Sequence, residues 1–216
     1  MILLVLSQNL MYCVDRVILA KYSVVAMYAA IVSGNFVAVV SWVFVGVATA
    51  SEIFVGQYNS QKRYDKLAIP VWQMIWMSCA SSIIVFIPLG YFSEYIHFLP
   101  KYAVRDGIDY QKPLLYFGFL PSLIAGLSAF FVGQGKTNII TIISILGNAV
   151  NAVLSYYLVI TLKMGAYGAA VGTVISQILQ FIILAAIFVN SKNRSMFKTM
   201  KSYAFNKRVF IDRYII

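Results

Sequence analysis

The chain has 216 residues, of which 61% are hydrophobic and 11% are charged, and its mean hydropathy is +0.82. Soluble globular domains carry about 25% charged residues, so this composition excludes an ordinary soluble domain and indicates an integral membrane protein. Cys13 and Cys79 both fall in apolar stretches, and His97 is the only histidine. These residues predict neither a disulfide framework nor a metal site.

Six apolar segments separated by short polar connections predict an all-α integral membrane bundle of six transmembrane helices. In chain order, the predicted spans are residues 1–20, 26–56, 70–98, 113–132, 137–161 and 165–189. Pro88 predicts a kink in the third span, and Pro121 predicts an interruption of the fourth. Residues 99–112 are predicted to form the longest internal loop, and residues 133–136, GQGK, a tight turn.

The spans divide the chain into a six-helix domain, residues 1–190, and a basic juxtamembrane tail, residues 191–216. If the N-terminus is cytoplasmic, most lysines and arginines of the loops and tail fall on the cytoplasmic side. The positive-inside rule therefore predicts a multi-pass chain in the cell (inner or plasma) membrane with both termini cytoplasmic. The tail is predicted to be attracted to anionic lipid rather than to nucleic acid, with Phe197, Met200 and Ala204 on its apolar face.

Asp15 lies within the first apolar segment, MILLVLSQNLMYCVDRVILA. A carboxylate at membrane depth costs about 3 kcal/mol or more, so it is a functional-site hypothesis by default. In the alternative interpretation, Asp15 lies near one face of the bilayer and pairs with Arg16. Because adjacent helix residues point about 100° apart, we expect Arg16 to face away from Asp15.

Three predicted helices each carry their polar residues on one face. In the fifth span these residues are Thr141, Ser144, Asn148, Asn151 and Ser155. In the sixth span they are Thr173, Ser176, Gln177 and Gln180, and in the first span they are Gln8 and Asp15. Such residues often only bond helices together, at about 0.6 kcal/mol each. Three polar faces in one bundle favour a hydrated cavity, with Gln8, Asn148 and Gln177 as candidate lining residues.

Four short motifs resemble those of MATE (multidrug and toxic compound extrusion) transporters. Val14-Asp15-Arg16 resembles the V-D-x motif of their first helix. Residues 46–50, GVATA, followed by 55–58, VGQY, resemble the end of their second helix. Residues 151–160, NAVLSYYLVI, resemble the fifth-helix pattern N-x-x-L-D-x-x-L-I, and residues 165–173, GAYGAAVGT, resemble the G-x-x-G-A-A-x-A-T opening of the sixth. The order and spacing of the motifs are more specific than any one of them.

The resemblance implies two six-helix lobes around a central cavity, with this chain as the N-terminal lobe and a second lobe as its partner. It implies efflux of organic cations or other amphipathic small molecules across the lipid bilayer by antiport with H⁺ or Na⁺, without a cofactor.

By position, Asp15, Asn151 and Thr173 match the cation- or proton-binding residues of the family. Ser155 stands where many members have a second aspartate. This departure leaves Asp15 as the single charge of the site, so protonation of its carboxylate is the simplest coupling event.

Two alternatives compete with efflux. A flippase of the same superfamily, which moves a lipid-linked polysaccharide, would favour a basic cavity, whereas an intramembrane acid favours cations. A non-transporting membrane scaffold would not need three polar faces. We expect the chain not to be an enzyme, because its sequence lacks the clustered acids, bases or metal ligands that catalysis requires.

Overall fold

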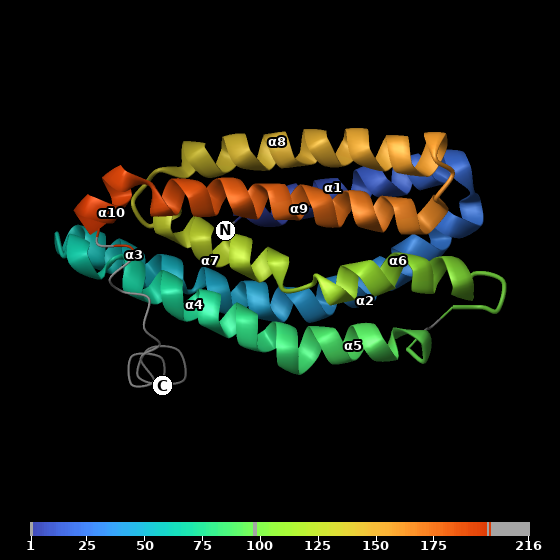
Figure 1. Ribbon diagram of the computed structural model, residues 1–216, viewed down its shortest axis with the longest axis horizontal. Helices are drawn as coiled ribbons and strands as arrows, with labels where there is room; N and C mark the ends of the chain where they lie inside the picture. The colour runs from blue at the N-terminus through green and yellow to red at the C-terminus, as the bar shows by residue number, and fades with distance from the viewer. Residues whose placement is uncertain (1, 97–98, 198, 200–216) are drawn as a thin grey trace.

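The computed structural model describes residues 2–96, 99–197 and 199, without the side chains of residues 2–5, 7, 8, 191, 192 and 194. The described chain consists of helices that lie roughly along one long axis, joined by short connections (Figure 1). The predicted all-α architecture is therefore confirmed.

The helices follow the order of the predicted spans. They are α1 (Ile2–Tyr22), α2 (Val24–Thr49), α3 (Ser51–Ser60), η1 (Tyr64–Lys66), α4 (Ala68–Ser81), η2 (Ser82–Phe86), α5 (Ile87–Tyr91), η3 (Phe92–Glu94), α6 (Val104–Tyr116), α7 (Leu120–Val132), α8 (Thr137–Tyr156), η4 (Tyr157–Thr161), α9 (Gly165–Val189) and α10 (Ser191–Phe197). Within the described residues, four segments are long and apolar enough to cross a membrane: Val24–Ser60, Tyr64–Glu94, Thr137–Thr161 and Gly165–Val189. The bent pair α6–α7 makes a fifth if it is counted as one span.

Two interruptions differ in detail from the prediction. In the third span the irregular segment is the π-helical turn η2, which ends just before α5 and its Pro88. A π-helical turn adds a residue to the helix, which is a known cause of kinks. In the fourth span the break lies at residues 117–119, ahead of Pro121, and α6 and α7 are bent by 42°. The predicted turn at 133–136 is present, with Gly135 at φ 76°.

The prediction of a long loop at residues 99–112 is wrong, because α6 begins at Val104. The charged residues of this stretch suggested a solvated connection. The buried residues of α6 instead recur at helical spacing and share one face: Gly107, Tyr110, Gln111, Leu114 and Leu115. An amphipathic pattern of this kind forms a helix when a bundle covers its apolar face.

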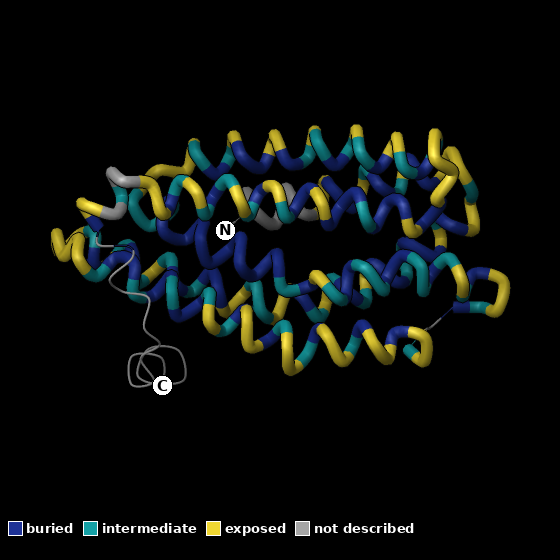
Figure 2. The backbone as a smooth tube through the Cα atoms, in the orientation of Figure 1, coloured by how far each residue is buried: buried dark blue, intermediate teal, exposed yellow. Residues whose placement is uncertain are grey.

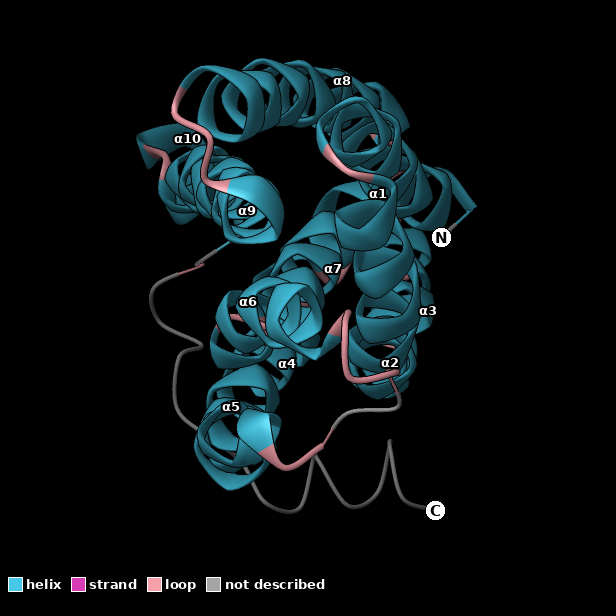
Figure 3. Ribbon diagram, turned by 90° about the vertical axis from the view of Figure 1, so that its right-hand side faces the viewer, coloured by secondary structure: helices cyan, strands magenta, loops and turns pink. Residues whose placement is uncertain are grey.

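The helices form one continuous bundle in which α9 packs against α8, α6 and α7, and α1 packs against α8 and α2 (Figure 3). Buried and exposed positions alternate along the peripheral helices such as α8, whereas α7 is buried almost throughout (Figure 2). One apolar cluster gathers residues of α1, α2, α6 and α9, and a second gathers residues of α3, α4, α7 and α9. The carboxylate of Asp15 lies beside the first cluster.

The described part of the tail packs onto the bundle. Phe197 of α10 is buried, and its ring lies 5.4 Å from the ring of Phe130, centroid to centroid. Trp72 Nε1 donates a hydrogen bond of 2.6 Å to the carbonyl of Thr199. The predicted amphipathic continuation, with Met200 and Ala204, lies outside the described residues.

Candidate functional site

Asp15 is fully buried, with none of its side chain exposed, and three side chains donate hydrogen bonds to its carboxylate. Ser155 Oγ donates to Oδ1 at 2.7 Å, and Thr173 Oγ1 donates to Oδ2 at 2.5 Å. Asn151 Nδ2 donates to Oδ1 at 3.3 Å. A buried charge is tolerated when hydrogen bonds replace its lost hydration, and these contacts do so for an ionised carboxylate.

The positions of these donors follow from helix geometry. Asn151 and Ser155 are four residues apart on α8 and therefore share one face. Thr173 comes from α9, which is able to approach closely because Gly172 has no side chain. A Cβ at Gly172 would lie 2.7 Å from Ser155 Oγ and 3.1 Å from the Ser155 amide nitrogen. The close contact of α8 and α9 thus depends on a glycine next to the site.

Asn151 links the donors to one another. Its Nδ2 lies 2.9 Å from Thr173 Oγ1 and 3.3 Å from Ser155 Oγ, in addition to its contact with Asp15. Its Oδ1 is buried, and the described part of the chain provides it with no hydrogen-bond partner. The site is therefore rich in oxygen atoms, with one acceptor still available to a proton donor or to a cation.

Arg16 does not share this site. Its Nη2 donates a hydrogen bond of 2.9 Å to Oδ1 of Asn35 on α2. The expectation that Arg16 faces away from Asp15 is confirmed, and the alternative of a local Asp15–Arg16 pair is wrong. The cause is the rotation of about 100° per residue, which directs consecutive side chains to different neighbouring helices.

The structure also brings two tyrosines to the carboxylate that sequence reasoning missed. Tyr12 on α1 and Tyr110 on α6 are both buried, and both lie close enough to Asp15 to interact with its charge. Tyr110 was missed because its segment was predicted to be a loop. The useful signal was the spacing of Tyr110 with Leu114, which is helical.

The structure describes the side chains of two of the three candidate cavity-lining residues, and these two differ in burial. Gln177 is buried on α9, four residues beyond Thr173, and Asn148 is half-buried on α8, three residues before Asn151. The side chain of Gln8 lies outside the described part of the structure. Because Asp15 is fully buried, the predicted hydrated cavity does not open onto its carboxylate in this conformation.

Metal-ligating groups are dispersed over the described residues. No three or more histidine, cysteine, aspartate or glutamate side chains there lie together in a way that could hold a metal ion. Cys13 and Cys79 are both free thiols at exposed positions of the bundle surface.

The fold is that of one lobe of a MATE transporter. It matches a multidrug-resistance MATE transporter of the MOP superfamily in the outward-facing conformation with a TM-score of 0.83 at 16% identity, covering 98% of this chain and 48% of that one. It matches MATE in the straight conformation with the same TM-score and identity, covering 100% of this chain and 49% of that one. A MOP superfamily transporter from Pyrococcus furiosus matches with a TM-score of 0.79 at 16% identity, over 97% of this chain and 47% of that one.

The family model MatE matches residues 1–157, and the chain therefore belongs to the MatE family of multi-pass membrane transporters, which are not enzymes. No curated protein matches the sequence. The chain spans about half the length of the solved transporters that it matches.

Proposed function

We propose that this chain is one lobe of a transporter that exports organic cations in exchange for protons, and that Asp15 carries the exchanged charge. The observation that carries the proposal is the complete burial of an acid among three side-chain donors inside the helix bundle. An intramembrane acid is costly, and it persists where it serves an ion or substrate pathway.

Antagonism between the proton and the cation supplies the mechanism. Burial disfavours a charged carboxylate, whereas the hydrogen bonds from Ser155, Thr173 and Asn151 favour it, so the charge of Asp15 is subject to two opposing influences. A cation bound nearby favours the ionised form and a proton removes the charge. Each ligand then lowers the affinity for the other by the same factor, which is the coupling that an exchanger needs.

The chain's own residues favour a proton over sodium as the coupling ion. Both carboxylate oxygens of Asp15 are already in direct contact with hydroxyl groups, and Ser155 supplies a neutral group in place of a second acid. Sodium would have to separate these contacts, although Asn151 Oδ1 and the hydroxyl oxygens are suitable ligands for it. Sodium coupling is therefore the second candidate, and the two are separable by experiment.

Export further requires a partner. Alternating access in secondary transporters moves one repeat against another, and the second six-helix lobe is the proposed partner of this one. A flippase is the alternative, because the reversed polarity of its binding pocket suggests a different function for the MOP superfamily transporter from Pyrococcus furiosus. The buried acid Asp15 favours a cationic substrate over the anionic substrate of a flippase. A non-transporting scaffold would not require a buried acid.

Calorimetry of cation binding tests the proposal at the level of this lobe. Titration of the purified chain with ethidium, a fluorescent organic cation, in two buffers of different ionisation enthalpy gives the number of protons released per cation bound. We expect release of up to one proton from the wild type and from Asp65→Asn, an exposed acid of η1, and none from Asp15→Asn. Equal release by Asp15→Asn, or no binding by the wild type, would overturn the proposal.

A repeat of the titration with sodium separates the two coupling ions. If sodium at constant pH weakens ethidium binding to the wild type and not to Asp15→Asn, sodium is the coupling ion. If a lower pH weakens ethidium binding and sodium does not, the proton is the coupling ion. Competition by neither ion would overturn coupling at Asp15 altogether.

A further inference from the structure

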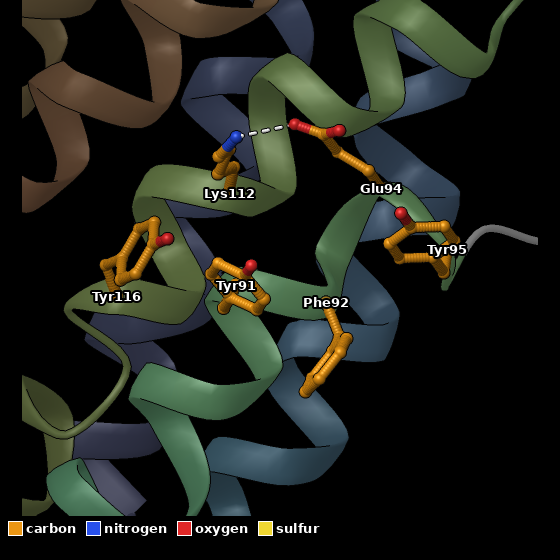
Figure 4. A pocket seen from close by; sticks show the side chains of 6 residues that line it. All are labelled: Tyr91, Phe92, Glu94, Tyr95, Lys112 and Tyr116. Atoms are coloured by element: carbon orange, nitrogen blue, oxygen red, sulfur yellow. Dashed lines mark hydrogen bonds and ion pairs between the residues drawn. The ribbon is translucent and has the colours of Figure 1, made fainter.

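A hollow of about 600 Å³ lies between the end of α5 with the turn that follows it and the helix α6 (Figure 4). Its lining residues are Tyr91, Phe92, Glu94, Tyr95, Lys112 and Tyr116. The volume is in the range of small-molecule sites. None of these residues belongs to the Asp15 site.

Both walls of the hollow are fixed by buried contacts. On one side, Gly90 allows the ring of Tyr116 to lie on the α5 backbone, since a Cβ there would be 2.9 Å from Tyr116 Cδ1. On the other side, the buried amide of Gln111 donates to the carbonyls of Ser93 and Ile96, at 2.6 and 2.8 Å. The turn that carries Glu94 is therefore tied to α6.

Aromatic rings and one ion pair give the hollow its chemistry. The rings of Tyr91 and Phe92 stand at 87° with their centroids 5.1 Å apart. Tyr91 and Tyr95 are 69% and 82% exposed, so their faces are available to a ligand. At the rim, Lys112 Nζ donates to Glu94 Oε1 at 2.7 Å. Aromatic faces beside a carboxylate attract an ammonium group, and a lysine with tyrosine hydroxyls attracts a phosphate.

The location of the hollow also suits a ligand that carries an ammonium group and a phosphate. The hollow lies at the end of the apolar segment Tyr64–Glu94, where a spanning helix leaves the hydrocarbon core. Tyrosines gather at this depth because their rings are apolar and their hydroxyls reach the headgroup region. A site at this depth faces lipid headgroups first.

We propose that this hollow binds the zwitterionic headgroup of a phospholipid, with its ammonium between the aromatic faces and Glu94 and its phosphate on Lys112. A free organic cation would have to displace Lys112 from Glu94 and leave the lysine without its partner. An anionic headgroup would meet the Glu94 carboxylate. A zwitterion supplies both charges. Its ammonium pairs with Glu94 and its phosphate pairs with Lys112, so neither protein charge loses a partner when the Glu94–Lys112 ion pair opens.

Native mass spectrometry of the purified chain tests this site without any transport assay. The protein is released from detergent that contains equal amounts of phosphatidylethanolamine and phosphatidylglycerol, and the bound lipids are counted. We expect preferential retention of phosphatidylethanolamine, reduced about two- to fivefold in Glu94→Gln, Lys112→Met and Tyr91→Leu. The control Tyr102→Leu changes a 71% exposed tyrosine outside the hollow and should leave retention unchanged.

Competition identifies the recognised chemistry. Soluble phosphocholine should displace phosphatidylethanolamine from the wild type, and tetramethylammonium at the same concentration should not. Equal retention of the two lipids, equal competition by tetramethylammonium, or an equal loss in Tyr102→Leu would each overturn the proposal. All of the substituted side chains are partly or largely exposed, and thermal unfolding of each variant verifies that its fold is intact.

Discussion

Substitution of Gly172 by alanine perturbs the Asp15 site through helix packing alone. The added Cβ would lie 2.7 Å from Ser155 Oγ and 3.3 Å from Ser155 Cα, so both the hydroxyl and the α8 backbone oppose it. Overpacking costs about 1–3 kcal/mol, and loss of a hydrogen bond to a charged group about 1.5–3 kcal/mol. The higher helix propensity of alanine offsets about 1 kcal/mol. The net loss of folding free energy is then about 1.5–5 kcal/mol.

Gly46→Ala is the matched control, because a Cβ at Gly46 would meet no atom within 4 Å. We expect this variant to be as stable as the wild type or up to about 1 kcal/mol more stable. The assay is unfolding by denaturant in one detergent for all three proteins. Equal stability of Gly172→Ala and Gly46→Ala would refute the reasoning that α9 must approach Ser155 so closely.

Three further substitutions test other contacts. Ser155→Asp places a second carboxylate against Asp15, and because two adjacent acids cannot both ionise without a cation, sodium should raise the melting temperature of this variant more than that of the wild type; equal sodium effects would contradict this. Gln111→Leu leaves the buried carbonyl of Ser93 and the partly buried carbonyl of Ile96 without their donor and should cost about 2 kcal/mol in unfolding experiments, whereas an unchanged stability would argue against this role of Gln111. Trp72→Phe removes the bond to the Thr199 carbonyl and should make the tail more sensitive to protease, and unaltered cleavage would show that the bond does not hold it.

The helices that could be predicted from the sequence are those whose spans contain no charged residue and no proline. The fifth and sixth spans were predicted at residues 137–161 and 165–189, and the structure gives them these same bounds. Apolar length alone determines such helices. Residues 99–112 were mistaken for a loop because charged residues alternate with the apolar residues of α6. The apolar face of α6 becomes evident only when the helices that cover it are known.

For the site, helical periodicity predicts that Asn151 and Ser155 share a face. That this face meets Asp15 came from the family resemblance, and the hydrogen bonds then place the three residues in contact. Tyr110 could not be assigned in this way, because its helix was not recognised. The contact of Gly172 with Ser155 depends on the distance between two helices, which no residue pattern specifies.

Infrared difference spectroscopy of Asp15 is the most direct test of proton-for-cation exchange in this lobe. The spectrum of the cation-bound protein minus that of the cation-free protein reports the carboxyl groups that lose a proton on binding. We predict the loss of one protonated-carboxyl band in the wild type and in Asp65→Asn, and no such loss in Asp15→Asn. A band that is lost equally in Asp15→Asn, or that is absent from the wild-type difference spectrum, would contradict the exchange of a proton for a cation at Asp15.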